Sequence, residues 1–297
     1  MATEGHDIPA EVVVRCFGLI PLWLRKALFI GLWRIFYHLS PKQRFIAVHN
    51  LLRAFPDKSM VEIVEIAKGA YRNLAIVCAE FFDLPRMDRE HLNRLLDIEG
   101  LERSLQALEK KKGLLIVGAH FGNWELMAVA VSVFIAPGVV IYRPLDNPFL
   151  DRIVRYVRSS TGNIPVPKRR AMLQMFRTLN KGGTVGVLID QNVSWKEGIF
   201  VDFFGRPACT TDGFAQMVLR AETPVMPAFM VRQPDGRYRL VIGDEIDIIR
   251  TEDWDADVKA NTQKFTSIIE DMIRQYPDQW LWLHNRWKTK VHQVRRQ

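Results

Sequence analysis

The chain has 297 residues, of which 48% are hydrophobic and 25% charged, proportions that exclude an intrinsically disordered protein and suffice for a large buried core. Its formal net charge of +8 predicts attraction to anionic partners such as membrane surfaces, acidic proteins and phosphate groups. The three cysteines, Cys16, Cys78 and Cys209, lie far apart without paired spacing. They indicate neither a zinc site nor a disulfide framework, so a reducing compartment is expected.

The segment 16–39 is apolar along one helical face. Its apolar arc comprises Leu24, Leu28, Gly31, Leu32, Ile35 and Leu39. Arg25, Lys26 and Arg34 interrupt it before the roughly 20 apolar residues that a spanning helix needs. The segment also contains the aromatic residues Trp23, Trp33 and Tyr37. This pattern predicts a helix that lies at a membrane interface with its cations near lipid phosphates. The alternative is an ordinary core helix. A cleavable signal peptide is not expected, because acidic residues precede any basic region.

Beyond this segment the pattern predicts helices and then a regular alternation. A capping box at Ser59–Glu62 opens a helix that ends at Pro85. Further helices are predicted at 89–96, 101–110, 169–180 and 255–275, with helix starts at Asn147 and Asp212, and strands at 114–117, 139–143, 184–189, 224–231 and 238–242. A long loop is expected from Asp190 to Thr211. The fold class is therefore α/β, with a mixed, largely parallel central sheet flanked by helices. The simplest partition is an N-terminal helical segment, 1–58, and a catalytic domain, 59–297.

His120 follows the predicted strand 114–117, at the sheet edge where chemistry gathers in open α/β folds. A histidine can take a proton from a hydroxyl near neutral pH, and Glu125, one turn into the next helix, is placed to hold its second ring nitrogen. Gly122 allows close backbone approach, and the N–H groups near Gly122 and Asn123 are candidate donors to an oxyanion. The alternative is a structural histidine at a helix end. No zinc-protease motif or nucleophile elbow is present.

With its neighbours, this motif resembles the late lipid A biosynthesis acyltransferases, the lauroyl and myristoyl transferase branch of the lysophospholipid acyltransferase superfamily. The matching blocks, in order, are His120–Glu125, Tyr142–Pro148, Asp190-Gln191, Gly198–Pro207, Thr223–Pro227 and Tyr276–Trp282. The basic, apolar N-terminal helix also fits, so the resemblance covers nearly the whole chain. Asn285 stands where many relatives are expected to carry a basic residue.

The resemblance implies an enzyme that moves a fatty acyl group from an acyl carrier protein thioester to a hydroxyl of a phosphorylated lipid A precursor. His120 would be the general base and Glu125 its acidic partner. Arg143 would contact a phosphate, and Asp190 and Arg206 match a block associated with acceptor binding. Taken alone, Arg143 has an ion pair with Asp146 as its alternative role. The remaining aromatic residues of these blocks are expected to pack: Phe203, Phe204, Trp280, Trp282 and Trp287.

The expected mechanism needs no metal, cofactor or acyl-enzyme. The expected place is the cytoplasmic face of the cell inner membrane, on its anionic surface. Basic residues near the site are either a docking patch for the acidic carrier protein or a solvated helix face: Arg152, Arg155, Arg158, Lys168, Arg169 and Arg170. The alternatives are transfer from acyl-CoA, another acceptor such as a lysophospholipid, ornithine lipid or glycolipid, a lipid thioesterase, and a non-catalytic lipid-binding protein. Nucleic-acid binding is not expected.

Overall fold

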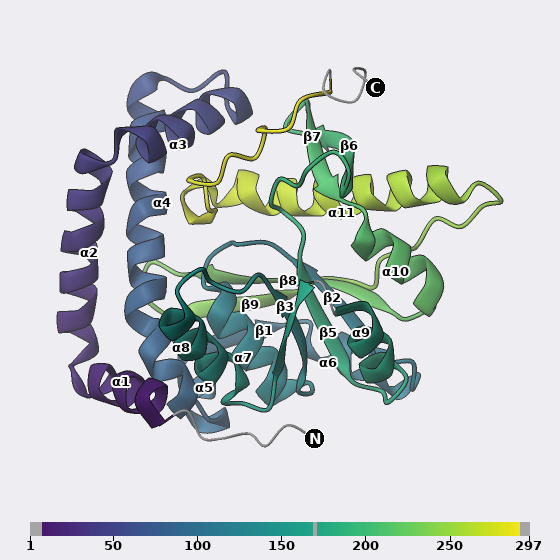
Figure 1. The fold of residues 1–297 in the computed structure, drawn as a ribbon, viewed down its shortest axis with the longest axis horizontal. Coiled ribbons are helices and arrows are strands. Elements are labelled where there is room, and N and C mark those ends of the chain that lie inside the picture. Colours follow the sequence, from purple (N-terminus) through teal and green to yellow (C-terminus); the bar gives the residue numbers. More distant parts are fainter. Residues whose placement is uncertain (1–7, 169–170, 292–297) are drawn as a thin grey trace.

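The computed structural model describes residues 8–168 and 171–291. Four helices form the N-terminal part: α1 (Ile8–Leu19), α2 (Leu22–Leu39), α3 (Pro41–Ala54) and α4 (Met60–Glu80), followed by the 3-10 helix η1 (Phe81–Arg86). In Figure 1, α2 and α4 run side by side along one edge of the molecule. The Ser59–Glu62 capping box is confirmed, since the Ser59 side chain accepts from the Glu62 amide and the Glu62 carboxylate accepts from the Ser59 amide.

A seven-stranded sheet follows, in the order β1-β9-β8-β2-β5-β3-β4. Its strands are β1 (Leu96–Glu99), β2 (Leu114–Gly118), β3 (Gly138–Tyr142), β4 (Ile164–Pro167), β5 (Thr184–Leu188), β8 (Val225–Arg232) and β9 (Tyr238–Ile242). Only the β8–β9 pairing is antiparallel, which confirms the largely parallel sheet. Because β2 lies between β5 and β8 and runs parallel to both, three carboxyl strand ends meet at one edge.

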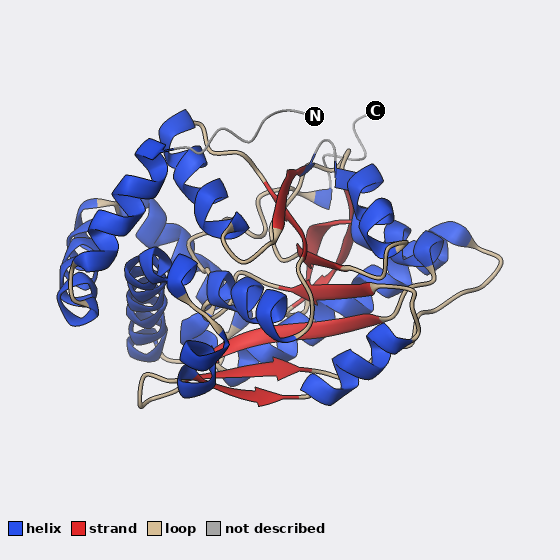
Figure 2. Ribbon diagram, turned by 90° about the horizontal axis from the view of Figure 1, so that it is seen from below, coloured by secondary structure: helices blue, strands red, loops and turns tan. Residues whose placement is uncertain are grey.

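Helices cover both faces of this sheet (Figure 2). They are α5 (Arg89–Leu95), α6 (Leu101–Glu109), α7 (Trp124–Phe134), α8 (Pro148–Ser159), α9 (Ala171–Leu179), α10 (Gly213–Ala221) and α11 (Trp254–Gln275), with a short 3-10 turn, η3 (Pro277–Gln279). Alternate residues of β2 face two separate cores. Leu115 and Val117 join the core under α9 to α11, while Leu114 and Ile116 join the core under α7. A strand buried on both faces explains the unbroken apolar run of its sequence.

The segment 190–211 corrects the sequence-based expectation of one long loop. It contains an antiparallel hairpin, β6 (Gly198–Phe203) and β7 (Arg206–Thr211). Its two turn residues, Phe204 and Gly205, both have positive φ, which suits a tight two-residue hairpin connection. The short strands β1 and β4 were also not predicted. Residues 169 and 170, where a helix was expected to begin, lie outside the described part of the chain.

The segment 16–39 is two helices, because α1 ends before Pro21 and α2 begins after it. The predicted apolar arc is present on α2 and faces outward: Leu24, Leu28, Leu32, Ile35 and Leu39 are 44%, 50%, 51%, 57% and 75% exposed. The placement of two cations near lipid phosphates was wrong, since Arg25 binds Asp83 and Lys26 binds Glu80. Within the described residues, no helix has both the length and the apolar character required to span a bilayer.

Candidate active site

His120 and Asp190 meet at the carboxyl edge of the sheet. Each lies two residues beyond its strand, and the ends of these strands, Gly118 and Leu188, are register partners. His120 Nδ1 lies 2.9 Å from Asp190 Oδ1, and the His120 amide donates to Asp190 Oδ2 at 3.1 Å. Trp280 Nε1 donates to the same Oδ2 at 2.8 Å. The Asp190 carboxylate therefore fixes the His120 ring, the His120 backbone amide and the Trp280 side chain.

The environment of Asp190 keeps it ionised. Its side chain is 2% exposed. Burial opposes the charged form, but the charge of His120 and the hydrogen bonds from His120 and Trp280 more than offset burial and lower the pKa of Asp190. A carboxylate on Nδ1 selects the tautomer with the proton on Nδ1, which leaves Nε2 unprotonated. The His120 side chain is 23% exposed, and its unprotonated Nε2 is the candidate base.

Residues 119–123, here called the His120 turn, are held by backbone hydrogen bonds to two other segments, strand β8 and residues 279–281. Gly122 N donates to Gln279 O at 2.8 Å, Asn123 N donates to Met230 O at 3.2 Å, and Leu281 N donates to His120 O at 3.1 Å. Gly122 has a φ of +56°, and a Cβ there would lie 1.6 Å from the Met230 carbonyl oxygen. Glycine is therefore required here by close backbone approach, as the sequence suggested, but the neighbour is the protein's own strand β8.

These bonds correct the expected oxyanion site. The amides of Gly122 and Asn123 both donate to carbonyl groups and do not face a ligand. Asn123 is 1% exposed and acts as the N-cap of α7, because its side chain accepts from the Leu126 amide at 3.0 Å. A different donor lies beside the reactive nitrogen: Gln191 Nε2 is 3.4 Å from His120 Nε2.

Glu125 also has a different partner from the one that the sequence suggested. Arg158 donates to both of its oxygens, from Nε at 2.9 Å and from Nη2 at 2.5 Å. Trp124 Nε1 donates to Oε1 at 3.0 Å, and the Trp124 ring meets the His120 ring edge-on at 5.4 Å. Burial disfavours the Glu125 carboxylate, but Arg158 outweighs it, so the pKa of Glu125 is lowered. The carboxylate that binds the His120 ring is Asp190. Glu125 instead holds Trp124, whose ring contacts the His120 ring.

The two predicted substrate arginines make their contacts with residues other than His120 and Asp190. The Arg143 side chain is 86% exposed and lies 3.5 Å from Asp146, the ion pair considered as its alternative. Arg206 lies at the hairpin turn, where its Nε donates to Arg53 O at 3.3 Å. It borders a cavity of about 690 Å³ that is lined by Arg53, Ala54, Phe55, Pro56, Asp57, Lys58, Glu62, Phe204, Gly205, Arg206 and Arg274. Four cations and two carboxylates line this cavity, which gives it a positive balance.

The proposed docking patch is smaller than expected. Arg158 is committed to Glu125, and Lys168 pairs with Glu197. Arg152 and Arg155 lie on the exposed side of α8, while 169–170 fall outside the described residues. The aromatic residues pack as predicted, with Phe203, Trp280, Trp282 and Trp287 at most 3% exposed. For Trp280, sequence reasoning missed the hydrogen bond that its indole donates to Asp190. Among the described residues, no three His, Cys, Asp or Glu side chains form a group that could hold a metal ion.

Comparison with known proteins supplies the family context. A family model described as bacterial lipid A biosynthesis acyltransferase matches residues 10–289. The chain is 25% identical to the lipid A biosynthesis lauroyltransferase of Escherichia coli over 271 residues, covering 89% of this chain and 85% of that protein. It is 28% identical to the lipid A biosynthesis palmitoleoyltransferase of the same organism over 285 residues, covering 92% and 90%.

More distant similarities extend beyond that group. A phosphatidylinositol mannoside acyltransferase from Mycolicibacterium smegmatis is 23% identical over 236 residues, covering 78% of this chain and 75% of the relative. Among solved structures, the 1-acyl-sn-glycerophosphate acyltransferase PlsC from Thermotoga maritima matches with a TM-score of 0.41 and 14% identity, covering 88% of this chain and 100% of that one.

Proposed function

Because the chain belongs to the bacterial lipid A biosynthesis acyltransferase family, and is therefore an O-acyltransferase with a lipid acceptor, we propose that it moves a fatty acyl chain from an acyl carrier protein thioester to a hydroxyl of a phosphorylated lipid A precursor. The observation that supports the proposed chemistry is the His120–Asp190 pair at the sheet edge, with the His120 side chain 23% exposed. The expected acidic partner, Glu125, is replaced in this role by Asp190.

In the proposed reaction, His120 Nε2 takes the proton of the acceptor hydroxyl as its oxygen attacks the thioester carbonyl carbon. Asp190 stabilises the imidazolium that forms, a role worth orders of magnitude in related proton-transfer sites. The side-chain amide of Gln191, 3.4 Å from His120 Nε2, is proposed to hold the tetrahedral oxyanion. When the carbon–sulfur bond breaks, the imidazolium returns its proton to the departing thiolate. The ester and the free carrier thiol are the products.

The cavity beside Arg206 is the proposed place for the acceptor's phosphorylated head. Arg53, Lys58, Arg206 and Arg274 line it, and guanidinium groups bind phosphate oxygens in a fixed, two-point geometry. Within it, Arg274 is paired with Glu270 and lies over the Phe204 ring at 4.4 Å, so its position is fixed before a ligand arrives. The exposed Arg143 is proposed to contact a donor or acceptor phosphate from solvent.

The outward arc of α2 supports a membrane-associated enzyme. Two aromatic side chains of this N-terminal part are also exposed, Trp23 of α2 at 71% and Phe45 of α3 at 68%. Exposed apolar side chains in this number are typical of a membrane or protein contact. We propose that it enters one leaflet at the cytoplasmic face of the inner membrane, where both acyl carrier protein and lipid precursor are accessible.

The test is a transfer assay with product masses. Purified protein is incubated with a tetra-acylated lipid A precursor and acyl carrier protein thioesters of several chain lengths. We expect one acyl chain to be added, and we expect His120→Ala to slow this addition by about a thousandfold. An acyl-CoA arm tests the rival donor, and a free fatty acid product would indicate a thioesterase.

A mannosylated phosphatidylinositol acceptor tests the second candidate function, which the similarity to the mycobacterial enzyme favours. Transfer to that acceptor but not to the lipid A precursor would overturn the proposed substrate while leaving the site chemistry intact.

A further inference from the structure

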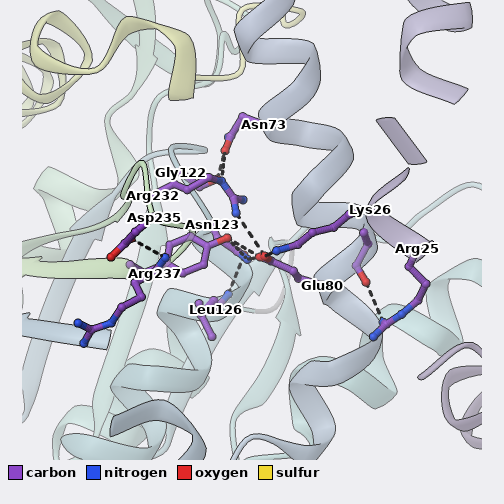
Figure 3. A network of polar contacts seen from close by, with 12 residues as sticks. Arg25, Lys26, Asn73, Glu80, Gly122, Asn123, Leu126, Arg232, Asp235 and Arg237 are labelled. Carbon is purple, nitrogen blue, oxygen red and sulfur yellow. Dashed lines mark hydrogen bonds and ion pairs between the residues drawn. The ribbon is translucent and has the colours of Figure 1, made fainter. Parts of the chain in front are cut away.

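Glu80, at the end of α4, collects donors from four other elements (Figure 3). Its side chain is 9% exposed. Lys26 Nζ of α2 lies 2.8 Å from Oε1, Arg232 Nη1 of β8 lies 3.3 Å from Oε1, and Asn123 Nδ2 donates to Oε2 at 2.8 Å. The Tyr238 hydroxyl of β9 donates to the same Oε2. A carboxylate buried with this number of donors is a fixed point in the structure, because each bond restrains it in a different direction.

Two paths lead from Glu80 to the His120 turn, and both end within three residues of His120. In the first, Asn123 uses its amide nitrogen on Glu80 and its amide oxygen on the Leu126 amide. In the second, Arg232 Nε donates to Asn73 Oδ1 at 3.2 Å, and Asn73 Nδ2 donates to Gly122 O at 3.0 Å. Glu80 therefore restrains the turn through one side chain of the turn and one of its carbonyl groups.

The donor from α2 differs from the others. The Lys26 side chain is 29% exposed, whereas Arg232 is 13% exposed, and Lys26 and Glu80 border a cavity of about 50 Å³ that also touches Asn123. Arg25, the preceding residue, is 2% exposed and bonds to Ala79 O and to Asp83, on either side of Glu80. Two consecutive cations of α2 thus bind the end of α4 at the level of the His120 turn.

We propose that Glu80 is a positioning residue for the His120 turn and that the Lys26–Glu80 ion pair couples this position to the seating of α2 against α4. The proposal rests on the proposed function for its effect on catalysis, but the coupling itself is a structural statement. In this proposal α2 both forms an exposed surface and helps to position the His120 turn. A change in how α2 lies against α4 alters one of two cations on Glu80, and Glu80 directly holds the residue that caps α7.

The structural arm measures amide hydrogen exchange in the full-length protein with Lys26→Met. Arg34→Met is the matched control, because it removes a cation from an exposed position of the same helix. Loss of a hydrogen bond to a charged group predicts exchange about tenfold faster in peptides from 119 to 126 in the Lys26 variant. No change is expected there in the control. Equal exchange in all three proteins overturns the coupling, and so does faster exchange spread over the whole chain, which would mark a general loss of stability.

The catalytic arm separates kcat from KM in the transfer assay. A turn displaced from its reactive position lowers kcat, so Lys26→Met is expected to reduce kcat about tenfold and to change KM for either substrate less than about twofold. Lys26→Arg keeps the charge and is expected to restore at least half of kcat. An unchanged kcat in Lys26→Met overturns the positioning role. A wild-type chain without transfer activity refutes the proposed function, whereas the exchange comparison still decides the coupling.

Discussion

Replacing Asp190 with asparagine removes the charge beside the base while keeping the shape of the side chain. Asp190 accepts from His120 N, His120 Nδ1 and Trp280 Nε1. An asparagine offers one acceptor oxygen and an amide nitrogen that cannot accept, so at least one of these donors loses its partner. The amide nitrogen next to Nδ1 favours the tautomer with its proton on Nε2. The ring then carries its proton on the wrong side for accepting one from a hydroxyl.

The size of the effect follows from the geometry. The contact of 2.9 Å between Nδ1 and Oδ1 places the two centres of charge about 4 Å apart in the imidazolium state. At an effective dielectric constant near 20, this attraction is about 4 kcal/mol, or roughly a thousandfold in rate. Glu125→Gln is the matched comparison, because that carboxylate binds Arg158 rather than the ring. It is expected to lower the chemical rate less than about tenfold and to lower stability by about 3 kcal/mol, because Arg158 is left buried with a weakened partner.

The assay is the single-turnover rate of acyl transfer at saturating acceptor, with thermal unfolding measured on the same samples. We expect Asp190→Asn to be about a thousandfold slower than wild type and near His120→Ala. A rate within tenfold of wild type would refute the assignment. A thousandfold loss in Glu125→Gln together with near-normal Asp190→Asn would show that the ring turns to Glu125 during the reaction.

Three further predictions concern acid stability, the turn and the membrane. Burial lowers the pKa of His284 to about 4, below the unfolded value near 6.5, so the unfolded chain binds the extra proton between these values and stability falls as pH drops from 6.5 to 4. The free energy of unfolding falls by about 3 kcal/mol over that pH window. His284→Gln should reduce this pH dependence, as measured by urea unfolding at several pH values. The same pH dependence in wild type and variant would contradict the prediction. Gly122→Ala should cost at least the 1–2 kcal/mol of a left-handed alanine and abolish transfer, whereas wild-type melting and turnover would show that the turn adapts. Changing Leu28, Leu32 and Ile35 to glutamine removes about 1 kcal/mol of apolar contact each, so vesicle co-sedimentation should weaken about a hundredfold, and unchanged binding would exclude this face of α2 as the lipid contact.

The sequence predicted His120 as the candidate base but not Asp190 as the carboxylate that binds its ring, and strand order explains why. The sequence indicates that His120 and Asp190 both follow buried strands, which is the signal that relates them. It does not indicate that β2 and β5 are neighbours, since β3 and β4 lie between them along the chain but not in the sheet. Without that order, Glu125 is the nearest carboxylate in sequence and the natural partner to choose. Long-range pairing thus decides the identity of the acidic residue.

The hairpin and the α2 cations were missed for related reasons. The Phe204-Gly205 turn lacks the asparagine or aspartate that usually marks a two-residue connection, so β6 and β7 looked like loop. The sequence shows that Arg25 and Lys26 interrupt the apolar segment, but their partners, Asp83 and Glu80, are more than 50 residues away along the chain. The periodicity of a helix in the sequence indicates on which face a residue lies. It does not indicate which distant residues pack against that face.

The arrangement of α2 is the reverse of an ordinary surface helix. Its cations Arg25 and Lys26 face the protein and its leucines face outward. In water this arrangement has two costs in free energy. The first is that apolar side chains stay in contact with water, and the second is that the charged groups of Arg25 and Lys26 lose solvent. The second cost is offset by Asp83 and Glu80, whose contacts are made inside the chain. The first would be offset by the membrane contact proposed above. The inward contacts end at the His120 turn, so the same helix links the surface proposed to enter the membrane to the base proposed to activate the acceptor hydroxyl.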